Sequence, residues 1–359
     1  MKIGILTGGG DCPGLNAVIR SAVRTATDHY KWEVVGFLNG YKGLVENKTR
    51  PLDSRAVSGL LARGGTMIGT SNVDNPYAFK EIINGSRVTH DVSDRVVKTY
   101  EANGLDGLII IGGDGTLATA LKLYKEKGLN IVGVPKTIDN DLSATDYTFG
   151  FDTAVNIVTE AVDRIKTTAE SHDRAMVVEV MGRDTGWIAL HSGLASGAHI
   201  IVIPEIPYDI EKIAEKIYER KSKGKHFSVV LVSEGAKPLG GNITVKRLVD
   251  DPSNAVRLGG VGNVLADQIE ALTKIETRVV TLGHVQRGGK PSAFDRILCT
   301  RLGVEAVNMV ANKEFGKMAC LKTPFIKSVP LEESAHNRKV DPSDQMIGEA
   351  RASGISFGD

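Results

Sequence analysis

Short runs of β-branched and aliphatic residues alternate with helical patterns along most of the chain, and this alternation constrains the fold more than any other feature. Such an order predicts an α/β protein built on parallel sheets, in which a helix returns the chain between strands. Several runs are apolar at consecutive positions, as expected of strands that are buried on both faces. The predicted strands are Lys2–Thr7, Glu33–Leu38, Gly107–Ile111, Ile131–Pro135, Ala175–Met181, Ile200–Ile203, Phe227–Val232 and Arg278–Leu282.

Three segments between these strands carry apolar residues at helical spacing, and we interpret the stripes as helix surfaces that face a core. They lie at residues 18–26, 154–165 and 210–217. The segment Lys237–Gly262 is rich in glycine, aspartate and asparagine, which predicts a loop insertion. The polar residues from Glu332 onward show no periodicity that assigns them to an element.

The chain of 359 residues is long enough for two or three domains. We predict a first α/β domain over residues 1–149, completed by about 285–320, and a second α/β domain over residues 150–284. The boundary falls near Gly150, where a motif-rich half ends and a long helical pattern begins. Residues 321–359 form a C-terminal extension that the sequence does not assign.

The charge balance is even, with 44 basic and 43 acidic residues, so the chain has no general attraction for nucleic acid or anionic membranes. No apolar run approaches a membrane span, and the N-terminal run is too short for a signal peptide. We therefore predict a cytoplasmic protein with neither nucleic acid nor membrane as a partner. Cys12, Cys299 and Cys320 fit no disulfide or zinc pattern, which predicts free buried thiols in a reducing compartment.

A glycine-rich turn, Gly8–Asn16, joins the first predicted strand to a helix. Backbone amides at such a helix N-terminus bind phosphate oxygens, although the turn also makes sense as a tight connection. A dinucleotide-binding fingerprint would require glycine at Pro13. A P-loop would require lysine and a hydroxyl residue where Leu15 and Asn16 stand. The turn therefore favours phosphate binding outside these two fold types.

A second turn reads Gly112-Gly113-Asp114-Gly115-Thr116 and follows the very apolar run 108–111. Asp114 fits either a helix cap or a carboxylate that holds a magnesium ion bridging phosphates. The turn indicates a nucleotide or polyphosphate without naming the acceptor.

A third turn, Pro135–Asp141, carries Asp139 and Asp141 directly after a buried strand. At the carboxyl edge of an open α/β sheet, such carboxylates face the place where ligands bind. One of them can accept a proton from an attacking hydroxyl while the other contacts a metal or orients the first. Three such turns at strand ends argue against three simple connections.

The second half of the chain offers cationic side chains, which phosphoryl transfer requires around the transferred group and any acceptor phosphate. The candidates are Arg174, Arg183, Arg278, His284 and Arg287, the last of them beside two glycines. In contrast, three other histidines lack metal-ligand spacing and are predicted to be structural or surface residues. These are His172, His191 and His199.

Five motifs in this order resemble the 6-phosphofructokinases, in particular the mixed-substrate group with ATP- and pyrophosphate-using members. The resemblance covers residues 1 to about 320 and implies two similar parallel-sheet α/β domains with the active site in the cleft between them. It implies that the first domain binds the phosphoryl donor and the second the sugar phosphate. The motifs are Gly-Gly-Asp-Cys-Pro-Gly-Leu-Asn at 9–16, Gly-Gly-Asp-Gly-Thr at 112–116, Pro-Lys-Thr-Ile-Asp-Asn-Asp at 135–141, Val-Glu-Val-Met-Gly-Arg at 178–183 and Leu-Gly-His-Val-Gln-Arg-Gly-Gly at 282–289.

The same resemblance implies phosphorylation of fructose 6-phosphate at its 1-hydroxyl, giving fructose 1,6-bisphosphate. Asp139 corresponds to the proton acceptor, Asp114 to the Mg²⁺ ligand, and Thr137 and Arg183 to further catalytic residues. The implied donor-binding residues are Gly10, Gly113, Asp114, Gly115 and Thr116. The implied substrate-binding residues are Thr137, Ile138, Asp139, Arg174, Met181, Gly182, Arg183, Glu234, Arg278, His284 and Arg287.

Two residues of the donor site point in opposite directions. Gly115 lacks the bulk and charge of the aspartate found in pyrophosphate-using relatives, whereas Lys136 resembles those relatives. Because a repulsive element discriminates more sharply than an added attraction, we expect ATP as the donor. The alternative is a pyrophosphate-dependent enzyme. A non-catalytic sugar-phosphate-binding subunit is a further alternative, against which the intact carboxylates argue.

In the family, the counterparts of Arg174 and Arg278 serve a neighbouring subunit, which implies a homodimer or homotetramer with shared active sites. Asn72 stands where an arginine near the donor is common. Arg20 and Arg24 match effector-site arginines of bacterial members, but the rest of that site, residues 53–61, does not. The sequence therefore leaves allosteric control open.

Overall fold

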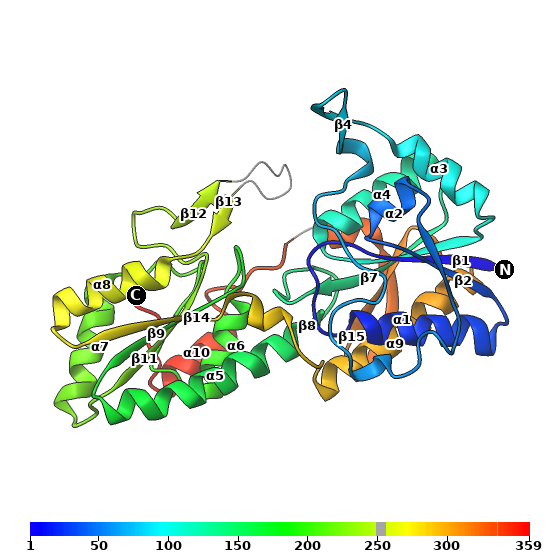
Figure 1. The fold of residues 1–359 in the computed structure, drawn as a ribbon. Helices are drawn as coiled ribbons and strands as arrows, with labels where there is room; N and C mark the ends of the chain where they lie inside the picture. Colours follow the sequence, from blue (N-terminus) through cyan, green and yellow to red (C-terminus); the bar gives the residue numbers. More distant parts are fainter. Residues whose placement is uncertain (249–255, 336) are drawn as a thin grey trace. The chain divides into compact units, whose positions relative to one another are not determined.

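A computed structural model describes residues 1–248, 256–335 and 337–359, which form two compact units (Figure 1). Neither unit is continuous in sequence, because the chain passes between them several times. Unit 1 comprises Met1–Thr137, Leu142–Asp152 and Arg287–Asn337, whereas unit 2 comprises Ile138–Asp141, Thr153–Gln286 and Arg338–Asp359.

Unit 1 is built on a mixed sheet with the strand order β16-β15-β7-β6-β1-β2-β3, and β8 pairs with β7. The strands from β15 to β2 run parallel, and antiparallel β16 and β3 close the two edges. The strands are β1 (Lys2–Thr7), β2 (Glu33–Phe37), β3 (Thr49–Leu52), β6 (Gly107–Gly112), β7 (Ile131–Thr137), β8 (Phe149–Gly150), β15 (Lys317–Lys322) and β16 (Phe325–Pro330).

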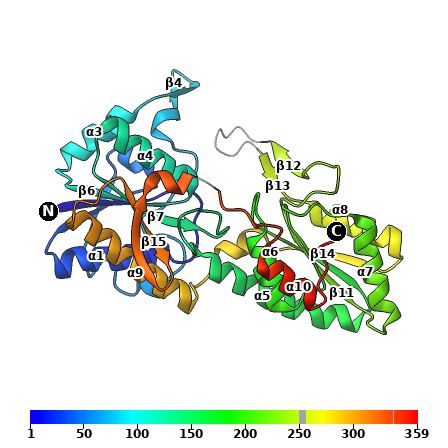
Figure 2. The ribbon, with the colours of Figure 1, turned by 180° about the vertical axis from the view of Figure 1, so that it is seen from behind.

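Helices cover both faces of this sheet, with α1 and α9 on one side and α3 and α4 on the other (Figures 1 and 2). Close packing of α1 on α9 requires Gly303, where a Cβ atom would lie 2.1 Å from the Ser21 hydroxyl oxygen. The helices are α1 (Leu15–Arg24), continued by a π-helical turn (Thr25–His29), α2 (Tyr41–Val45), α3 (Ser93–Ala102), α4 (Asp114–Lys127) and α9 (Ala293–Ala311). A separate hairpin pairs β4 (Phe79–Ile83) with β5 (Ser86–His90).

Unit 2 contains a parallel sheet in the order β10-β11-β9-β14. Its strands are β9 (Ala175–Val180), β10 (Ile200–Val202), β11 (Ser228–Ser233) and β14 (Thr277–Thr281). Its helices are α5 (Phe151–Ser171, whose first two residues belong to unit 1), α6 (Trp187–Ser196), α7 (Ile210–Ser222), α8 (Val261–Thr273) and α10 (Gln345–Ala352).

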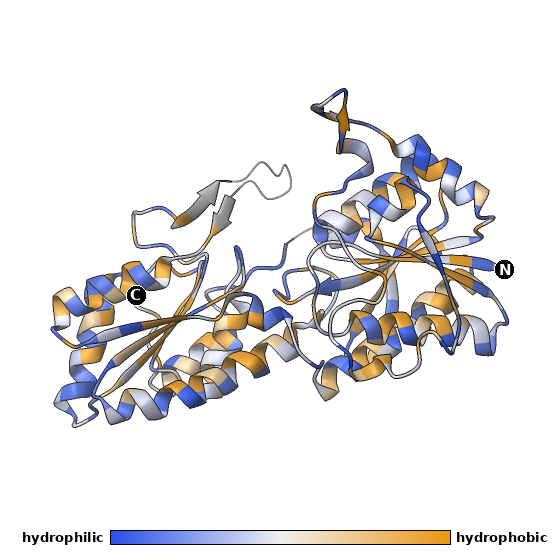
Figure 3. Ribbon diagram, in the orientation of Figure 1, coloured by the Kyte–Doolittle hydropathy of each residue, from blue (hydrophilic) through white to orange (hydrophobic). Residues whose placement is uncertain are grey.

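Alternation along the strands decides which helix covers which face of the unit 2 sheet. Val177 and Val230 pack with α7 and α8, whereas Ile201 contacts α6 closely enough that a Cβ atom on Gly193 would lie 2.5 Å from it. The sheet is therefore buried on both faces, as its uninterrupted apolar strands predicted. Figure 3 shows these hydrophobic strands and the alternating polar and apolar residues of the helices around them.

Residues after α10 extend the unit 2 sheet beyond its edge strand β10. Ser356 forms a parallel bridge with Ile200, and its carbonyl oxygen accepts a hydrogen bond of 2.9 Å from the backbone of Ile201. The side chain of Phe357 is buried, and the Gly358 carbonyl accepts from Asp209 at 2.6 Å. This segment covers backbone groups that an open sheet edge would leave without partners.

The α/β class with parallel sheets is confirmed, and all eight predicted strands are present with ends that shift by a residue or two. The loop prediction for 237–262 is wrong in part, because β12 (Val245–Leu248) and β13 (Val256–Leu258) form a ribbon there. Residues 249–255 lie outside the described part of the chain.

Of residues 321–359, which the sequence does not assign, those up to Asn337 belong to unit 1 and those from Arg338 to unit 2. The three cysteines are free and buried, as predicted. Within the described ranges, no helix has both the length and the hydropathy to cross a membrane.

Candidate active site

Three predicted turns follow strands that are neighbours in the unit 1 sheet, where the order β7-β6-β1 places their carboxyl ends together. The first two turns are hydrogen bonded to each other where they begin, with the Gly8 amide donating to the Ile111 carbonyl at 2.8 Å. The sequence motifs at 8–16, 112–116 and 135–137 therefore meet at one edge, as expected for parallel strands.

Helix α4 begins within this edge without a side-chain cap. Gly113 occupies the N-cap position, and Asp114 is the acidic residue of the first turn. The amides of such a first turn have no partner within the helix and attract anions, which the helix dipole reinforces. Gly115 is exposed, and a Cβ atom built on it would meet nothing within 4 Å. The amino end of α4 thus begins without a side-chain cap and has open space at Gly115.

Glycine is required where the turns pack against Thr116. A Cβ atom on Gly8 would lie 2.6 Å from the Thr116 methyl carbon, and one on Gly112 would lie 2.3 Å from its Cβ atom. Tyr41 fixes the same residue from behind by donating from its hydroxyl to the Thr116 carbonyl at 2.8 Å. The side chain of Thr116 therefore packs against both the first turn, at Gly8, and the second turn, at Gly112.

Two cationic side chains lie beside Gly10 in the first turn. The Nζ atom of buried Lys136 donates to the Gly10 carbonyl at 2.6 Å, and a Cβ atom on Gly10 would lie 1.9 Å from Nη1 of Arg287. Cys12 nearby is buried, which raises the pKa of its thiol to about 12 and excludes a reactive thiolate at neutral pH. Asn72 adjoins the same turn, since the carbonyl of its neighbour Ser71 accepts from the Gly9 amide at 2.9 Å.

The third turn is divided between the two units. Thr137 ends a segment of unit 1, where its carbonyl accepts from the Thr148 hydroxyl at 2.8 Å, and Ile138 begins a segment of unit 2. Within unit 2, Asp139 is 5% exposed, and its carbonyl oxygen lies 3.4 Å from the Thr185 hydroxyl. Asn140 adopts a left-handed backbone with φ 52°, which turns the chain sharply between the two aspartates.

Four predicted substrate-binding residues of unit 2 follow adjacent strands: Gly182 and Arg183 after β9, Glu234 after β11 and His284 after β14. The Arg183 amide donates to a Glu234 carboxylate oxygen at 3.2 Å. Arg183 has φ 49°, an unfavourable conformation for a side chain of this size. Such strain is retained mainly where surrounding structure and function both require it.

This strained turn is tightly surrounded within unit 2. A Cβ atom on Gly235 would lie 1.9 Å from the Arg183 carbonyl oxygen, and the Met181 amide donates to the Gln286 side chain at 3.3 Å. The backbone of Arg183 therefore packs directly against the residue that follows Glu234.

Arg174 and Arg278 lie elsewhere in the same unit, because they stand at the amino ends of β9 and β14. The six residues of β9 separate Arg174 from the turn that contains Arg183, about 20 Å at 3.3 Å per residue. Both arginines pair with Glu276, which lies 2.8 Å from the Arg174 Nε atom. The Arg174 hydrogen bond, together with both positive charges, lowers the pKa of the Glu276 carboxyl.

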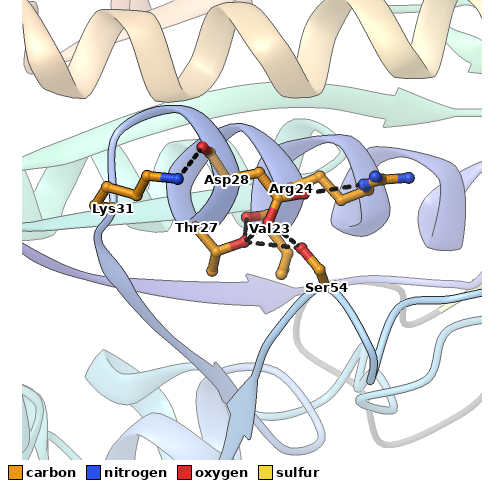
Figure 4. Close-up of polar contacts among 6 residues, drawn as sticks. All are labelled: Val23, Arg24, Thr27, Asp28, Lys31 and Ser54. Carbon is orange, nitrogen blue, oxygen red and sulfur yellow. Dashed lines mark hydrogen bonds and ion pairs between the residues drawn. The ribbon is translucent and has the colours of Figure 1, made fainter.

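The predicted effector-site residue Arg24 takes part in a polar cluster on the surface of unit 1 (Figure 4). Its Nε atom lies 3.2 Å from Oδ2 of Asp28, whose other oxygen accepts from the hydroxyls of Ser54 and Thr27. These bonds, led by that from Ser54, lower the pKa of Asp28. The charge of Arg24 is thus partly balanced by a carboxylate of its own helical segment.

The described residues contain no group of three or more histidine, cysteine, aspartate or glutamate side chains that would hold a metal alone. Asp114 is partly exposed at the amino end of α4. Mg²⁺ usually keeps several waters and is held by one or two carboxylates together with substrate phosphates. The surroundings of Asp114 fit that mode of binding.

Three residues that contact the predicted site residues were not predicted from the sequence. Glu276 stands directly before β14 and two residues before Arg278, so its nearness to that arginine could be predicted from the sequence. Thr185 and Tyr41 hold site residues through single hydroxyls, and nothing in the local sequence marks them.

Comparisons with known proteins agree on one family. A sequence model of the family described as Phosphofructokinase matches residues 2–310. The chain is 52% identical over 361 residues to ATP-dependent 6-phosphofructokinase 2 of Clostridium perfringens, covering 100% of this chain and 98% of that one. It is also 52% identical over 344 residues to a pyrophosphate–fructose 6-phosphate 1-phosphotransferase of Streptomyces coelicolor, covering 96% and 97%. Because some relatives are named for ATP and others for pyrophosphate, they confirm the resemblance to the mixed-substrate group.

Solved structures show the same fold. The pyrophosphate-dependent phosphofructokinase from Nitrosospira multiformis matches with a TM-score of 0.82 over 100% of this chain and 92% of that one. Because its sequence identity is only 21%, this match supports the fold and nothing further. The family match and the full-length relatives together show that the chain belongs to the phosphofructokinase family.

Proposed function

We propose that the chain transfers a phosphoryl group from ATP to the 1-hydroxyl of fructose 6-phosphate, giving fructose 1,6-bisphosphate in glycolysis. The names of relatives at about half identity support this reaction. The observation that carries the proposal is the uncapped amino end of α4, where backbone donors and Asp114 stand beside two further strand-end turns. That combination suits a polyphosphate and its metal ion.

Unit 1 residues hold the donor in this proposal. The amides around Gly113 and Thr116 receive phosphate oxygens, and the absence of a side chain at Gly10 lets the Arg287 guanidinium lie against this turn. Asp114 holds Mg²⁺, which when bound neutralises phosphate charge and orients the transferred group. The proposed donor site comprises Gly10, Gly113, Asp114, Gly115 and Thr116.

The proposed step moves one proton to Asp139 and one phosphoryl group to the sugar. The Asp139 carboxylate accepts the proton of the sugar 1-hydroxyl, and that oxygen attacks the γ-phosphorus as the bond from phosphorus to the ADP oxygen breaks. Thr137 and the Arg183 guanidinium contact the transferring phosphoryl group and offset its developing charge. Asp114 and Asp139 are thus assigned to one reaction.

The sugar phosphate is assigned to residues that follow the strands of unit 2, together with Ile138 and Asp139 of the third turn and Arg287 of unit 1. Charge-assisted hydrogen bonds from arginine suit a phosphate, and Glu234 suits a sugar hydroxyl. The proposed set is Ile138, Asp139, Met181, Gly182, Arg183, Glu234, His284 and Arg287. We assign Arg174 and Arg278 to the site of a neighbouring subunit, because they stand at the opposite ends of β9 and β14.

ATP is favoured over pyrophosphate by Gly115. Open space around a Cβ atom at this position leaves a path for the α-phosphate and ribose, which a carboxylate would obstruct by volume and like charge. Lys136 and a pyrophosphate-using relative at the same 52% identity support the second candidate, a pyrophosphate-dependent enzyme.

Initial rates with fructose 6-phosphate and magnesium test the proposal, with ATP and pyrophosphate supplied in turn. We expect turnover with ATP and at least tenfold lower kcat/KM with pyrophosphate, a difference of about 1.4 kcal/mol. Faster turnover with pyrophosphate would reverse the donor assignment. No product with either donor, together with tight binding of fructose 6-phosphate, would favour a non-catalytic binding subunit.

A further inference from the structure

Residues Arg338–Val340, here called the C-terminal strap, contact the segment of unit 2 that carries the proposed base. The Arg338 amide donates to the carbonyl oxygen of Asp141 at 2.6 Å, two residues beyond Asp139. Both segments belong to unit 2, although about 200 residues separate them in sequence. The strap therefore holds one end of the loop 138–141.

The side chain of Arg338 is fixed on an aromatic ring. Its guanidinium carbon lies 4.6 Å from the centroid of Trp187, and the Nε1 atom of Trp187 donates to the Arg338 carbonyl at 2.9 Å. Because Trp187 is buried, both the cation–π contact and the hydrogen bond form in partly desolvated surroundings, where each is stronger. The ring thus holds both the side chain and the backbone of Arg338.

A single carboxylate ties the strap to the turn that precedes Trp187. Oε1 of Glu205 accepts from the amide of Gly186 at 3.1 Å and from the amide of Val340 at 2.9 Å. One acceptor shared by two backbone segments keeps those segments in register.

The same turn holds the other end of the loop. The Thr185 hydroxyl lies 3.4 Å from the Asp139 carbonyl and 3.1 Å from the Gly182 carbonyl, so its proton is shared between them. The loop is therefore held at Asp139 by Thr185 and at Asp141 by Arg338. Trp187 and Glu205 connect those two supports, which closes a ring of contacts around the proposed base.

We propose that Arg338 and Trp187 are positioning residues that fix the direction of the Asp139 carboxylate through this ring. The inference rests on the proposed function of Asp139. A general base loses efficiency steeply when its oxygen moves from hydrogen-bond reach of the reacting proton. A displaced carboxylate slows proton transfer directly, so the strap acts on turnover more than on substrate affinity.

The test uses Arg338→Met, which keeps an unbranched apolar stem without the guanidinium, and Trp187→Phe, which keeps a ring without the Nε1 donor. We expect each variant to lower kcat about tenfold while KM changes less than about threefold. Arg338→Lys retains a cation over the ring and should recover part of the loss. The matched control is Arg351→Met, which removes another arginine–aromatic contact of the C-terminal segment, 5.2 Å from Phe357, and should leave kcat unchanged.

A double-mutant comparison separates positioning from general stability. In an Asp139→Asn background no proton can be accepted, so Arg338→Met should lower the residual turnover no further. An equal fall in both backgrounds, or unchanged kcat in both Arg338→Met and Trp187→Phe, would overturn the inference. If Arg338→Met fails to fold, Trp187→Phe and Arg338→Lys make the same comparison. Normal turnover of Asp139→Asn itself would instead overturn the proposed function.

Discussion

The ammonium group of Lys136 donates a hydrogen bond of 2.6 Å to the carbonyl oxygen of Gly10, which joins the third turn of unit 1 to the first. Lys136 is 6% exposed, so this bond forms away from bulk water. A residue that the family resemblance predicts to influence donor choice is thus also a structural bridge. Its positive charge lies beside the same turn as the guanidinium of Arg287.

Replacing this lysine should therefore cost stability. We expect Lys136→Met to lower the free energy of unfolding by about 1–3 kcal/mol, because the Gly10 carbonyl loses a buried charged donor. Urea unfolding measures the change. Lys98→Met removes an exposed lysine of α3 and should change stability by less than about 0.5 kcal/mol. Equal effects of the two substitutions would show that the bridge contributes nothing to stability.

Gly115→Asp tests the choice of donor. We expect kcat/KM with ATP to fall by at least ~10²-fold, about 2.7 kcal/mol, because the new carboxylate repels the α-phosphate. Pyrophosphate use supported by Lys136 should then become detectable. Gly348→Asp is the matched control, since Gly348 is another helical glycine with open space around its Cβ position. Unchanged ATP kinetics in Gly115→Asp would refute this account of the donor site.

Asp139→Asn tests the proposed base. The amide keeps the shape of the side chain but accepts no proton at neutral pH, so kcat should fall by ~10²-fold or more. Affinity for fructose 6-phosphate should change little, which equilibrium binding measures directly. A folded variant with normal turnover would assign proton removal to another group.

Mixed oligomers test whether neighbouring subunits share a site. If Arg174 and Arg278 serve the neighbour, chains with Arg278→Ala and chains with Asp139→Ala should together rebuild some intact sites after subunit exchange. Activity above the sum of the two parents is the expected result, with hybrids confirmed by native mass spectrometry. If hybrids are confirmed but show no added activity, we would conclude that Arg174 and Arg278 serve the site of their own subunit.

His199 should make unfolding depend on pH. Burial lowers its pKa from 6.5 to about 3, and its Nδ1 atom accepts from the Val229 amide at 2.9 Å. Between about pH 6.5 and about pH 3, His199 binds a proton in the unfolded chain but not in the folded chain. The free energy of unfolding is therefore highest above about pH 6.5 and falls as the pH decreases toward about 3. The slope from one site is at most about 1.4 kcal/mol per pH unit, and partial exposure of the ring makes it smaller.

The variant His199→Asn keeps an acceptor near the Nδ1 position without a group that titrates in this range. Urea unfolding at about pH 5 and about pH 7 should show a smaller pH difference for the variant than for the unmodified chain. An identical difference in both proteins would mean that His199 titrates normally.

The strands and the turns that follow them were predictable from local sequence, because a buried parallel strand needs an apolar run and phosphate-binding turns need glycine. Runs such as 108–111 and 131–134 carry this signal without help from distant residues. The ribbon of β12 and β13 was not predictable in this way. Its strands are only four and three residues long and mix aliphatic with basic residues, so the pairing of the two strands with each other is what the structure adds.

Supports of the candidate site depend on contacts between distant segments, which local patterns do not contain. Lys136 and Gly10 are separated by 126 positions, and Trp187 and Arg338 by 151. Their residue types suit many environments. Only the folded chain brings Lys136 to Gly10 and Arg338 to Trp187. Glu276 differs, since it stands only two residues before Arg278 and this separation is local information.

The interleaving of the two units in sequence has a consequence for synthesis. Unit 1 includes residues up to Asn337, and the edge of the unit 2 sheet is covered only by residues near Ser356. A ribosome therefore exposes β10 as an open edge long before its partner segment is made. Such edges pair readily with other chains. Nascent chains of this family member should thus depend on being shielded, or on finishing quickly, during the interval in which neither unit is complete.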